Sequence, residues 1–265
     1  MNVYLESLGC ARNQVDSEEM LARLGEAGWT VTDDPEAADA IVVNTCSFIE
    51  SAANESVETI LALAEYKTSG RCRRLVVAGC LPERYREATA DELPEVDVFL
   101  GTGAFDRIVD ALGDDLAGDT CLLPDPDTIE TGAPLARAST VPHAAYLKIA
   151  EGCSRACTYC IIPNLRGRQK SRPREVVLRE ARHLADAGAK ELTLVAQDST
   201  AYGRDLTPAC GLADLLTDLV TTLPEVWIRV LYGHPLSIRD DVLAVAAARD
   251  TVCPYFDIPI QHSSS

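Results

Sequence analysis

Long hydrophobic runs are missing from this sequence. No apolar stretch approaches the ~20 residues that a helix needs to cross a membrane. The start of the chain also lacks the basic and apolar segments of a secretory signal, because Met1 leads directly into Asn-Val-Tyr-Leu. We therefore expect a cytoplasmic protein with no membrane association. In that setting the ten cysteines are reduced and available for metal binding, rather than paired in disulfides.

Basic residues are also scarce, since 24 Lys and Arg stand against 41 Asp and Glu and give a net charge of −17. The imbalance lies in residues 1–140, which hold 10 basic and 27 acidic residues, whereas residues 141–265 hold 14 of each. An acidic half repels nucleic acid phosphates and attracts a basic partner, so direct nucleic-acid binding is not expected. The alternative is that the charge serves solubility alone.

Three cysteines lie close together in the middle of the chain. Cys153, Cys157 and Cys160 are separated by three and then two residues, and they follow an apolar run that predicts a strand. Thiolates at this spacing suit zinc or an iron–sulfur cluster. A structural zinc site requires four protein ligands, whereas three thiolates on a [4Fe–4S] cluster leave one iron open to a small molecule. The alternative is three buried apolar cysteines without a metal.

The first half alternates short apolar runs with helical patterns. Strands are expected at 2–8, 40–44, 75–79 and 96–100, and helices at 15–28, 52–66, 84–93 and 105–112. This alternation predicts a parallel, doubly wound sheet. Continuous apolar strands such as Ile-Val-Val fit a sheet that is covered on both faces. We assign residues 1–116 to this α/β domain.

Cys10, Cys46 and Cys80 each follow the end of a predicted strand. The carboxyl ends of parallel strands share one edge of a sheet, so these cysteines should converge into a second site with three thiolates. Cys72 precedes its strand and should lie at the opposite edge. The alternative is three unrelated cysteines at loop starts. Three polar residues lie beside these cysteines: Asn13, Asn44 and Ser47. Each would either donate a hydrogen bond to a cluster sulfur or cap the helix that follows, and capping is favoured for Asn13.

The second half follows a region rich in proline and threonine, which we assign as a linker over 117–140. Strands are expected at 144–150, 191–196, 226–232 and 255–260, and helices at 173–188, 212–223 and 238–248. This order predicts a partial (β/α) barrel over 141–265, with its chemistry at the carboxyl strand ends. The polar residues there would line a pocket or serve as hydrogen-bonded structural residues; they are Gln197, Asp198, Ser199, Thr200, His234, Gln261 and His262.

A basic segment follows the three-cysteine loop, with 8 basic and 2 acidic residues between Arg155 and Arg182. It would hold a carboxylate of a cofactor or substrate, or it is a solvated entry to a helix. The chain stops at Ser265, directly after a predicted strand with no helix to cover it. Because an open sheet edge is a liability, we expect this sequence to be a fragment.

The spacing Cys-x3-Cys-x2-Cys, with Tyr159 before the last cysteine, resembles the signature of the radical S-adenosylmethionine (SAM) superfamily. With both cysteine trios, the chain resembles the methylthiotransferases of that superfamily. The matching motifs are Ser7-Leu-Gly-Cys10, Asn13 with Val-Asp-Ser-Glu18, Val43-Asn-Thr-Cys46-Ser-Phe-Ile, Gly79-Cys80-Leu-Pro-Glu-Arg-Tyr85, Glu151-Gly-Cys153 through Cys160-Ile-Ile-Pro, Arg166-Gly, Gln197-Asp198, Ala201-Tyr-Gly-Arg-Asp205 and Tyr255-Phe-Asp-Ile-Pro-Ile-Gln-His262.

Two branches of this family are candidates. One modifies an adenosine of tRNA, and the other, RimO, modifies an aspartate of the small-subunit ribosomal protein numbered twelve. The motifs around the first trio and the Tyr-Gly-x-Asp segment are similar to RimO. That branch implies a basic protein substrate, an external electron donor and a sulfur source. The alternatives are the tRNA branch and a non-catalytic iron–sulfur or zinc-binding protein.

The resemblance implies two [4Fe–4S] clusters and SAM. An auxiliary cluster would lie on Cys10, Cys46 and Cys80, and the radical SAM cluster on Cys153, Cys157 and Cys160. One SAM would supply the methyl group for sulfur held at the auxiliary cluster. A second would give the radical that removes a β-hydrogen from the target aspartate. Tyr159, Gln197 and Asp198 are expected to contact the cofactor, and no side chain is required as a catalytic acid or base.

The sequence departs from the family pattern in two respects. Ala11-Arg12 stands where Pro-Lys is usual after the first cysteine. Family members also continue into the rest of the barrel and a small C-terminal β-domain (TRAM) that contacts the substrate, and these 265 residues contain neither.

Overall fold

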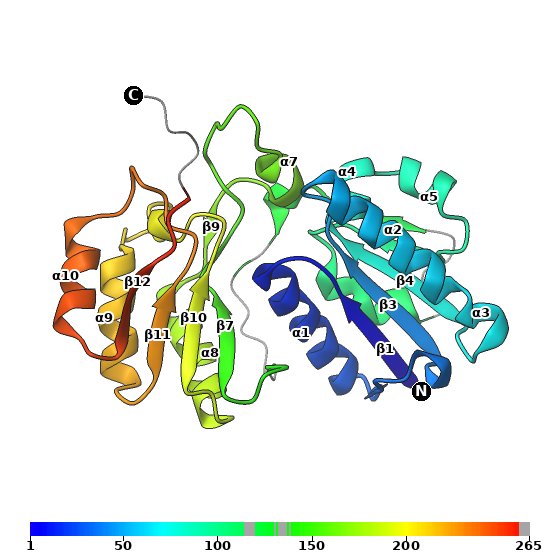
Figure 1. Cartoon of the computed structure of the whole chain (residues 1–265), viewed down its shortest axis with the longest axis horizontal. Coiled ribbons are helices and arrows are strands. Elements are labelled where there is room, and N and C mark those ends of the chain that lie inside the picture. The colour runs from blue at the N-terminus through cyan, green and yellow to red at the C-terminus, as the bar shows by residue number, and fades with distance from the viewer. Residues whose placement is uncertain (114–119, 130, 132–136, 138, 260–265) are drawn as a thin grey trace. The chain divides into compact units, whose positions relative to one another are not determined.

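The computed structural model describes residues 1–113, 120–129, 131, 137 and 139–259 (Figure 1). The chain divides into two compact units. The first contains Met1–Ile129 together with Ala156–Gly167, and the second contains Glu130–Arg155 together with Arg168–Ser265. Cys157 and Cys160 therefore belong to the first unit, whereas Cys153 belongs to the second. The domain boundaries expected at 116 and 140 stay a prediction.

The first unit contains a six-stranded parallel sheet in the order β2-β1-β3-β4-β5-β6. Its strands are β1 (Asn2–Ser7), β2 (Thr30–Val31), β3 (Ala40–Thr45), β4 (Arg74–Gly79), β5 (Val98–Leu100) and β6 (Cys121–Leu122). Its helices are α1 (Ala11–Glu26), α2 (Glu50–Ala64), α3 (Tyr66–Ser69), α4 (Cys80–Tyr85), α5 (Ala88–Glu92), α6 (Ile108–Leu112) and α7 (Ile162–Arg166). Short 3-10 turns lie at η1 (Pro35–Ala37), η2 (Phe105–Arg107) and η3 (Pro126–Thr128).

Both faces of this sheet are buried. Every residue of β3 is buried, and successive side chains enter two different cores. Ile41 and Val43 pack with Ile60 of α2, whereas Val42 packs with Met20 of α1. Figure 1 shows α1 and α2 on opposite sides of β1 and β3. The predicted doubly wound sheet is therefore confirmed.

Three details of this unit differ from the expected pattern. The strands β2 and β6 were not expected, because two-residue strands form by backbone pairing and carry no side-chain period. Strand β6 contains Cys121, in the range expected to be a linker, and pairs with β5. The helix expected at 84–93 is two helices, since α4 begins at Cys80 and ends where Arg86 adopts a positive φ of 54°.

The second unit contains a four-stranded parallel sheet in the order β12-β11-β10-β7. Its strands are β7 (Ala144–Lys148), β10 (Glu191–Val195), β11 (Trp227–Val230) and β12 (Val252–Phe256), and the antiparallel pair β8 (Ala150–Glu151) and β9 (Lys170–Ser171) follows β7. The helices are α8 (Arg174–Asp186), α9 (Leu212–Thr222) and α10 (Asp240–Ala248), with a 3-10 turn η4 (Ser199–Ala201). Consecutive βα units in spatial order confirm the predicted partial barrel. No helix in the described residues has the length and apolarity to cross a membrane.

A buried ion cluster ties α8 to β7 in this unit. Glu180 of α8 lies 2.8 Å from Arg137 and 2.6 Å from Arg172. Arg137 also donates to the carbonyl of Tyr146, and Arg172 donates to that of Lys148 at 2.8 Å. Burial raises the pKa of Glu180, but the two guanidinium groups outweigh this effect and hold the pKa below its ordinary value. The carboxylate is therefore ionised at neutral pH and compensates two buried cations.

We expect Glu180→Gln to lower the free energy of unfolding by about 3–5 kcal/mol at pH 7, because two buried guanidinium groups lose their anion. Glu175→Gln on the exposed face of α8 is the control and should have little effect. The folded-state pKa of Glu180 is depressed, so its contribution is complete above the unfolded value of about 4.3 and is lost as the pH falls through the folded value. Urea unfolding should show the stabilities of wild type and Glu180→Gln converging in that acidic window. A difference in free energy of unfolding that stays constant with pH would contradict the depressed pKa of Glu180.

Candidate functional site

The first unit brings Cys10, Cys46 and Cys80 to one edge of its sheet. The three cysteines follow β1, β3 and β4, which are neighbours in the sheet. The strands end at matched positions, because Thr45 pairs with Gly79. Cys10 is the residue before α1, and Cys80 is the first residue of α4. The predicted convergence thus follows from the register of parallel strands.

The cysteines are close enough to influence one another. Gly9 has a φ of +94°, and a Cβ atom there would lie 2.7 Å from Cys46 Cβ and 3.2 Å from its Sγ. Glycine is therefore required for the Cys10 loop to approach Cys46. Burial raises the pKa of Cys80, Arg166 opposes this effect, and the neighbouring Cys46 and Cys10 raise it further. The three sulfur atoms share one electrostatic environment.

The polar residues beside the trio fix the backbone. Asn13 lies inside α1 and is buried; its amide nitrogen donates to the carbonyls of Leu8 at 3.0 Å and Thr45 at 2.8 Å. The expectation that Asn13 caps a helix is wrong, because Cys10 occupies that position and no side-chain capping bond is present there. Asn44 donates to the Asn13 carbonyl at 2.9 Å, and Ser47 donates to the Cys80 carbonyl at 2.8 Å.

Arg166 is a site residue that sequence reasoning did not single out. It ends α7, its side chain is 2% exposed, and one of its nitrogens lies 3.6 Å from the Sγ of Cys80. In the sequence it is one of eight basic residues in a basic segment. The available signal was its place in the Arg166-Gly motif, which does not indicate what the side chain contacts.

The second trio is divided between the units. Cys153 is buried in the second unit and follows Gly152, whose φ is +75°. In the first unit, the amide of Cys160 donates to the carbonyl of Cys157 at 3.1 Å and closes a turn. Tyr159 in this turn is 67% exposed, and partial desolvation together with neighbouring Cys157 raises the pKa of its hydroxyl.

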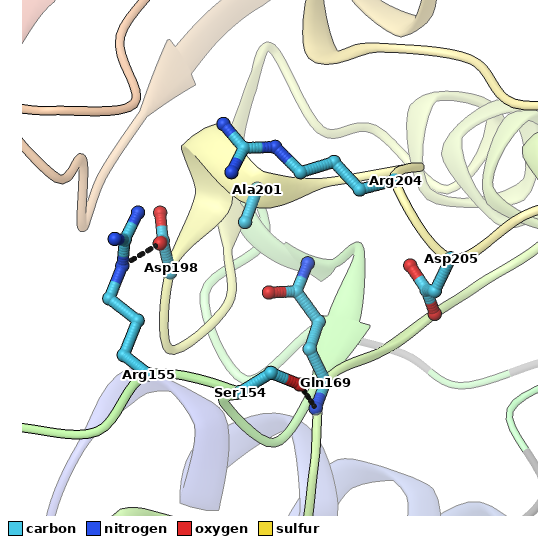
Figure 2. A pocket seen from close by; sticks show the side chains of 7 residues that line it. All are labelled: Ser154, Arg155, Gln169, Asp198, Ala201, Arg204 and Asp205. Atoms are coloured by element: carbon cyan, nitrogen blue, oxygen red, sulfur yellow. Dashed lines mark hydrogen bonds and ion pairs between the residues drawn. The ribbon is translucent and has the colours of Figure 1, made fainter.

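A cavity of about 270 Å³ lies in the second unit, lined by Ser154, Arg155, Gln169, Asp198, Ala201, Arg204 and Asp205 (Figure 2). Figure 2 shows Arg155 beside Asp198, and the Nε–Oδ2 distance is 2.7 Å. The second carboxylate oxygen of Asp198 accepts from Thr200 at 2.6 Å. Because both oxygens have protein donors, Asp198 holds Arg155 in the cavity wall.

The side-chain amides of Gln197 and Gln169 each have one atom without a hydrogen-bond partner in the described part of the chain. The nitrogen of Gln197 donates to Glu151 at 2.6 Å, whereas its buried oxygen has no partner in the described part of the chain. The buried nitrogen of Gln169 likewise has none among those residues, and Gln169 lines the cavity. A buried polar atom without a partner is costly, so this acceptor and donor suit a polar ligand.

The other polar residues expected at strand ends have different outcomes. His234 Nδ1 accepts from the amide of Leu236 at 3.2 Å, and the His234 amide donates to Thr200 at 3.1 Å. These bonds stabilise a turn. Ser199 is fully buried, and its hydroxyl has no partner in the described ranges. Gln261 and His262 lie outside the described residues.

Within the described residues, no group of three or more His, Cys, Asp or Glu side chains could hold a single metal ion. A [4Fe–4S] cluster has a different requirement, because each thiolate binds a different iron of an extended cluster. Soft sulfur donors without accompanying carboxylates or imidazoles suit iron–sulfur chemistry. The donor set of Cys10, Cys46 and Cys80 therefore fits such a cluster.

Comparisons with known proteins agree with this chemistry. Residues 2–101 match the family described as "Uncharacterized protein family UPF0004", and residues 147–264 match the radical SAM superfamily. The protein named ribosomal protein uS12 methylthiotransferase RimO from Desulfosudis oleivorans is 55% identical over all of this chain and 60% of its own length. The RimO protein of Anaeromyxobacter sp. (strain K) is 50% identical, over 99% of this chain and 56% of that protein.

The chain carries a UPF0004 domain and a radical SAM domain, and it is similar over its whole length to methylthiotransferases named RimO. It spans about 60% of the length of the curated methylthiotransferases that it matches. Radical SAM membership implies a [4Fe–4S] cluster and SAM. A solved structure of the radical SAM methyltransferase TsrM from Kitasatospora setae has the same fold, with a TM-score of 0.68 at 13% identity, over 98% of this chain and 59% of that one.

We expect Gly9→Ala to lower the free energy of unfolding by about 1–2 kcal/mol for the left-handed backbone alone, and further through the contact with Cys46. Gly25→Ala in α1 is the matched control, because a Cβ there meets nothing within 4 Å. That change should be neutral or stabilising by up to about 1 kcal/mol. Denaturant unfolding of the metal-free chains measures both; equal stability of the two variants would contradict the close approach.

Proposed function

We propose that this chain forms the cluster-binding part of an enzyme that adds a methylthio group to the β-carbon of an aspartate in ribosomal protein uS12. The main support is the gathering of Cys10, Cys46 and Cys80 at one sheet edge, in a chain that also carries the radical SAM cysteine pattern. Relatives about 50% identical over the whole chain are named as uS12 methylthiotransferases. The proposal extends that activity to this chain.

The auxiliary cluster is proposed to bind through Cys10, Cys46 and Cys80. The buried Asn13 and Asn44 hold α1 against β3 around these cysteines, and Ser47 holds the start of α4. The radical SAM cluster is assigned to Cys153, Cys157 and Cys160 on their spacing. Such clusters supply electrons and an open iron when they are bound. The chain contributes ligands, orientation and the charge around them.

SAM is proposed to contact Gln197, Asp198 and Tyr159. The free oxygen of Gln197 is suited to accept from an amino group. Asp198 would act through Arg155, because the ion pair aims that guanidinium along the cavity wall and a guanidinium binds a carboxylate well (Figure 2). Tyr159, which is largely exposed, presents an aromatic face for the adenine. No described side chain is assigned as a catalytic acid or base.

The proposed partners follow from charge and chemistry. Residues 1–140 carry the whole net charge of −17, which favours a basic ribosomal protein over a nucleic acid. An external electron donor and a sulfur source are required by the proposed reaction. Because the acceptor is a ribosomal protein, we place the reaction in the cytoplasm. The tRNA branch remains the second candidate and is separated by experiment.

Two cysteine variants test the cluster assignment. After anaerobic reconstitution, the chain should hold about eight irons, four for each cluster. Changing either trio to Ala should lower this content to about four, and Cys121→Ala, outside both trios, should not. With dithionite, the auxiliary-trio variant should still release 5′-deoxyadenosine from SAM, whereas the Cys153/Cys157/Cys160 variant should not. A chain that cleaves SAM without the second trio, or that binds only zinc, would refute the proposal.

The acceptor is tested in a strain lacking the methylthiotransferase gene. The full-length gene that contains this chain should restore a methylthiolated aspartate in uS12, detected by mass spectrometry. Modification of a tRNA adenosine without change in uS12 would move the assignment to the sister branch.

Gln197→Met tests the SAM contact. The replacement has a similar shape but lacks both the amide oxygen and the nitrogen that donates to Glu151. SAM binding should weaken by about tenfold, the effect of one hydrogen bond to a charged group. Equilibrium dialysis against the reconstituted chain measures the affinity. Thr193→Val on β10 is the control, since the Thr193 hydroxyl already donates to Glu191. An unchanged affinity in Gln197→Met would remove this residue from the site.

A further inference from the structure

Arg166 has an unusual set of partners for an arginine in the first unit. Its Nη1 atom lies 2.7 Å from Asp16 Oδ2, and its Nη2 atom lies 2.6 Å from Asn13 Oδ1. The same Nη2 atom donates toward Cys80 Sγ at 3.6 Å, and the guanidinium lies 5.7 Å from the centre of the Phe105 ring. One buried side chain therefore joins α1, α4 and η2.

A charged donor faces the sulfur of Cys80 at this point. Arg166 and Asp16 are 2% and 0% exposed, so each needs the other in a site without water. The pair is neutral by itself, and the guanidinium still directs a donor at the Cys80 sulfur. A neutral thiol is a weak acceptor, whereas an ionised sulfur makes a charge-assisted bond. The arrangement is suited to Cys80 in its metal-ligated, anionic form.

A second contact holds the same helix. The hydroxyl of Thr102 donates to the carbonyl of Leu165 at 2.6 Å, and the amide of Thr102 donates to Glu83 of α4 at 3.0 Å. Helix α7 is therefore attached on one side to α1, which follows Cys10, and on the other to α4, which begins at Cys80. It begins two residues after Cys160, so these attachments fix the segment 156–167 that carries Cys157 and Cys160.

We propose that Arg166 is a positioning residue with two linked roles at the auxiliary thiolate site. Its guanidinium hydrogen-bonds the ligated sulfur of Cys80 and offsets the negative charge of the cluster. The same side chain holds the segment that carries Cys157 and Cys160 against α1 and α4. The first role rests on the proposed function, because it requires Cys80 to be a cluster ligand; the second does not.

The first role is tested by the reduction potential of the auxiliary cluster. In a chain with Cys153, Cys157 and Cys160 changed to Ala, only that cluster forms. Arg166→Gln should lower the midpoint potential of this cluster, because the reduced and more negative cluster loses a positively charged hydrogen-bond donor. The expected fall in the equilibrium constant of reduction is about tenfold. Arg166→Lys keeps the charge and should fall between Gln and wild type. A redox titration followed by electron paramagnetic resonance gives the values.

The control is Arg86→Gln, which breaks the 2.7 Å ion pair with buried Glu83 on α4 but removes no donor from a sulfur. It should lower stability and leave the potential unchanged. If Arg166→Gln or Arg166→Lys takes up iron and has the wild-type potential, the sulfur contact has no electronic role. If Arg166→Gln takes up no iron, the midpoint potential of Arg166→Lys decides whether the sulfur contact has an electronic role.

The second role is tested in the metal-free chain by amide hydrogen exchange. Arg166→Gln and Arg166→Lys should both increase exchange over residues 156–167 by roughly tenfold or more. Lys67→Gln, which breaks the 2.8 Å ion pair with Asp97 elsewhere in the first unit, should not. Unchanged exchange in both Arg166 variants would overturn the positioning role. A wild-type chain that binds no iron through the first trio would defeat the proposed function instead, and the exchange result would stand independently.

Discussion

The parallel pairing of β1, β3 and β4 is the constraint on which the first cysteine site depends. Cys10, Cys46 and Cys80 are separated by more than thirty residues from one another, and only the register of these strands brings them to one edge. A slip of one residue would turn every side chain of a strand to the opposite face and bury the wrong set. Because both faces of β3 are packed, the cores on either side oppose such a slip.

Much of this architecture was predictable from the sequence. Runs such as Ile41-Val-Val and Leu75-Val-Val, separated by helical patterns, indicate a parallel sheet because its strands are buried on both faces and are apolar throughout. The convergence of Cys10, Cys46 and Cys80 follows from that topology. The two-residue strands β2 and β6 were not predictable, because backbone pairing alone forms them. The break between α4 and α5 was also missed, since it depends on the backbone conformation of Arg86.

The polar surroundings of the site were harder to predict than its cysteines. Asn13 lies just before the helix expected at 15–28, as a cap would, yet two of its partners, Thr45 and Arg166, are far away along the chain. Arg166 contacts residues about 150 positions earlier, and the Arg166-Gly motif marks its position without indicating these contacts. The charged side chains around a buried site come from residues that are close in the fold but distant in the sequence. Sequence motifs therefore identify the cysteine ligands but not the charged residues that pack beside them.

The first unit is discontinuous in sequence, since it is completed by Ala156–Gly167 after the chain has entered the second unit. A nascent chain emerges from the N-terminus onward, so the sheet of the first unit is available long before Arg166 is. Until then, the buried ion pair between Asp16 and Arg166 cannot form. The order of synthesis therefore separates the sheet of the first unit from an ion pair buried inside it, and that pair is completed by a segment translated after part of the second unit.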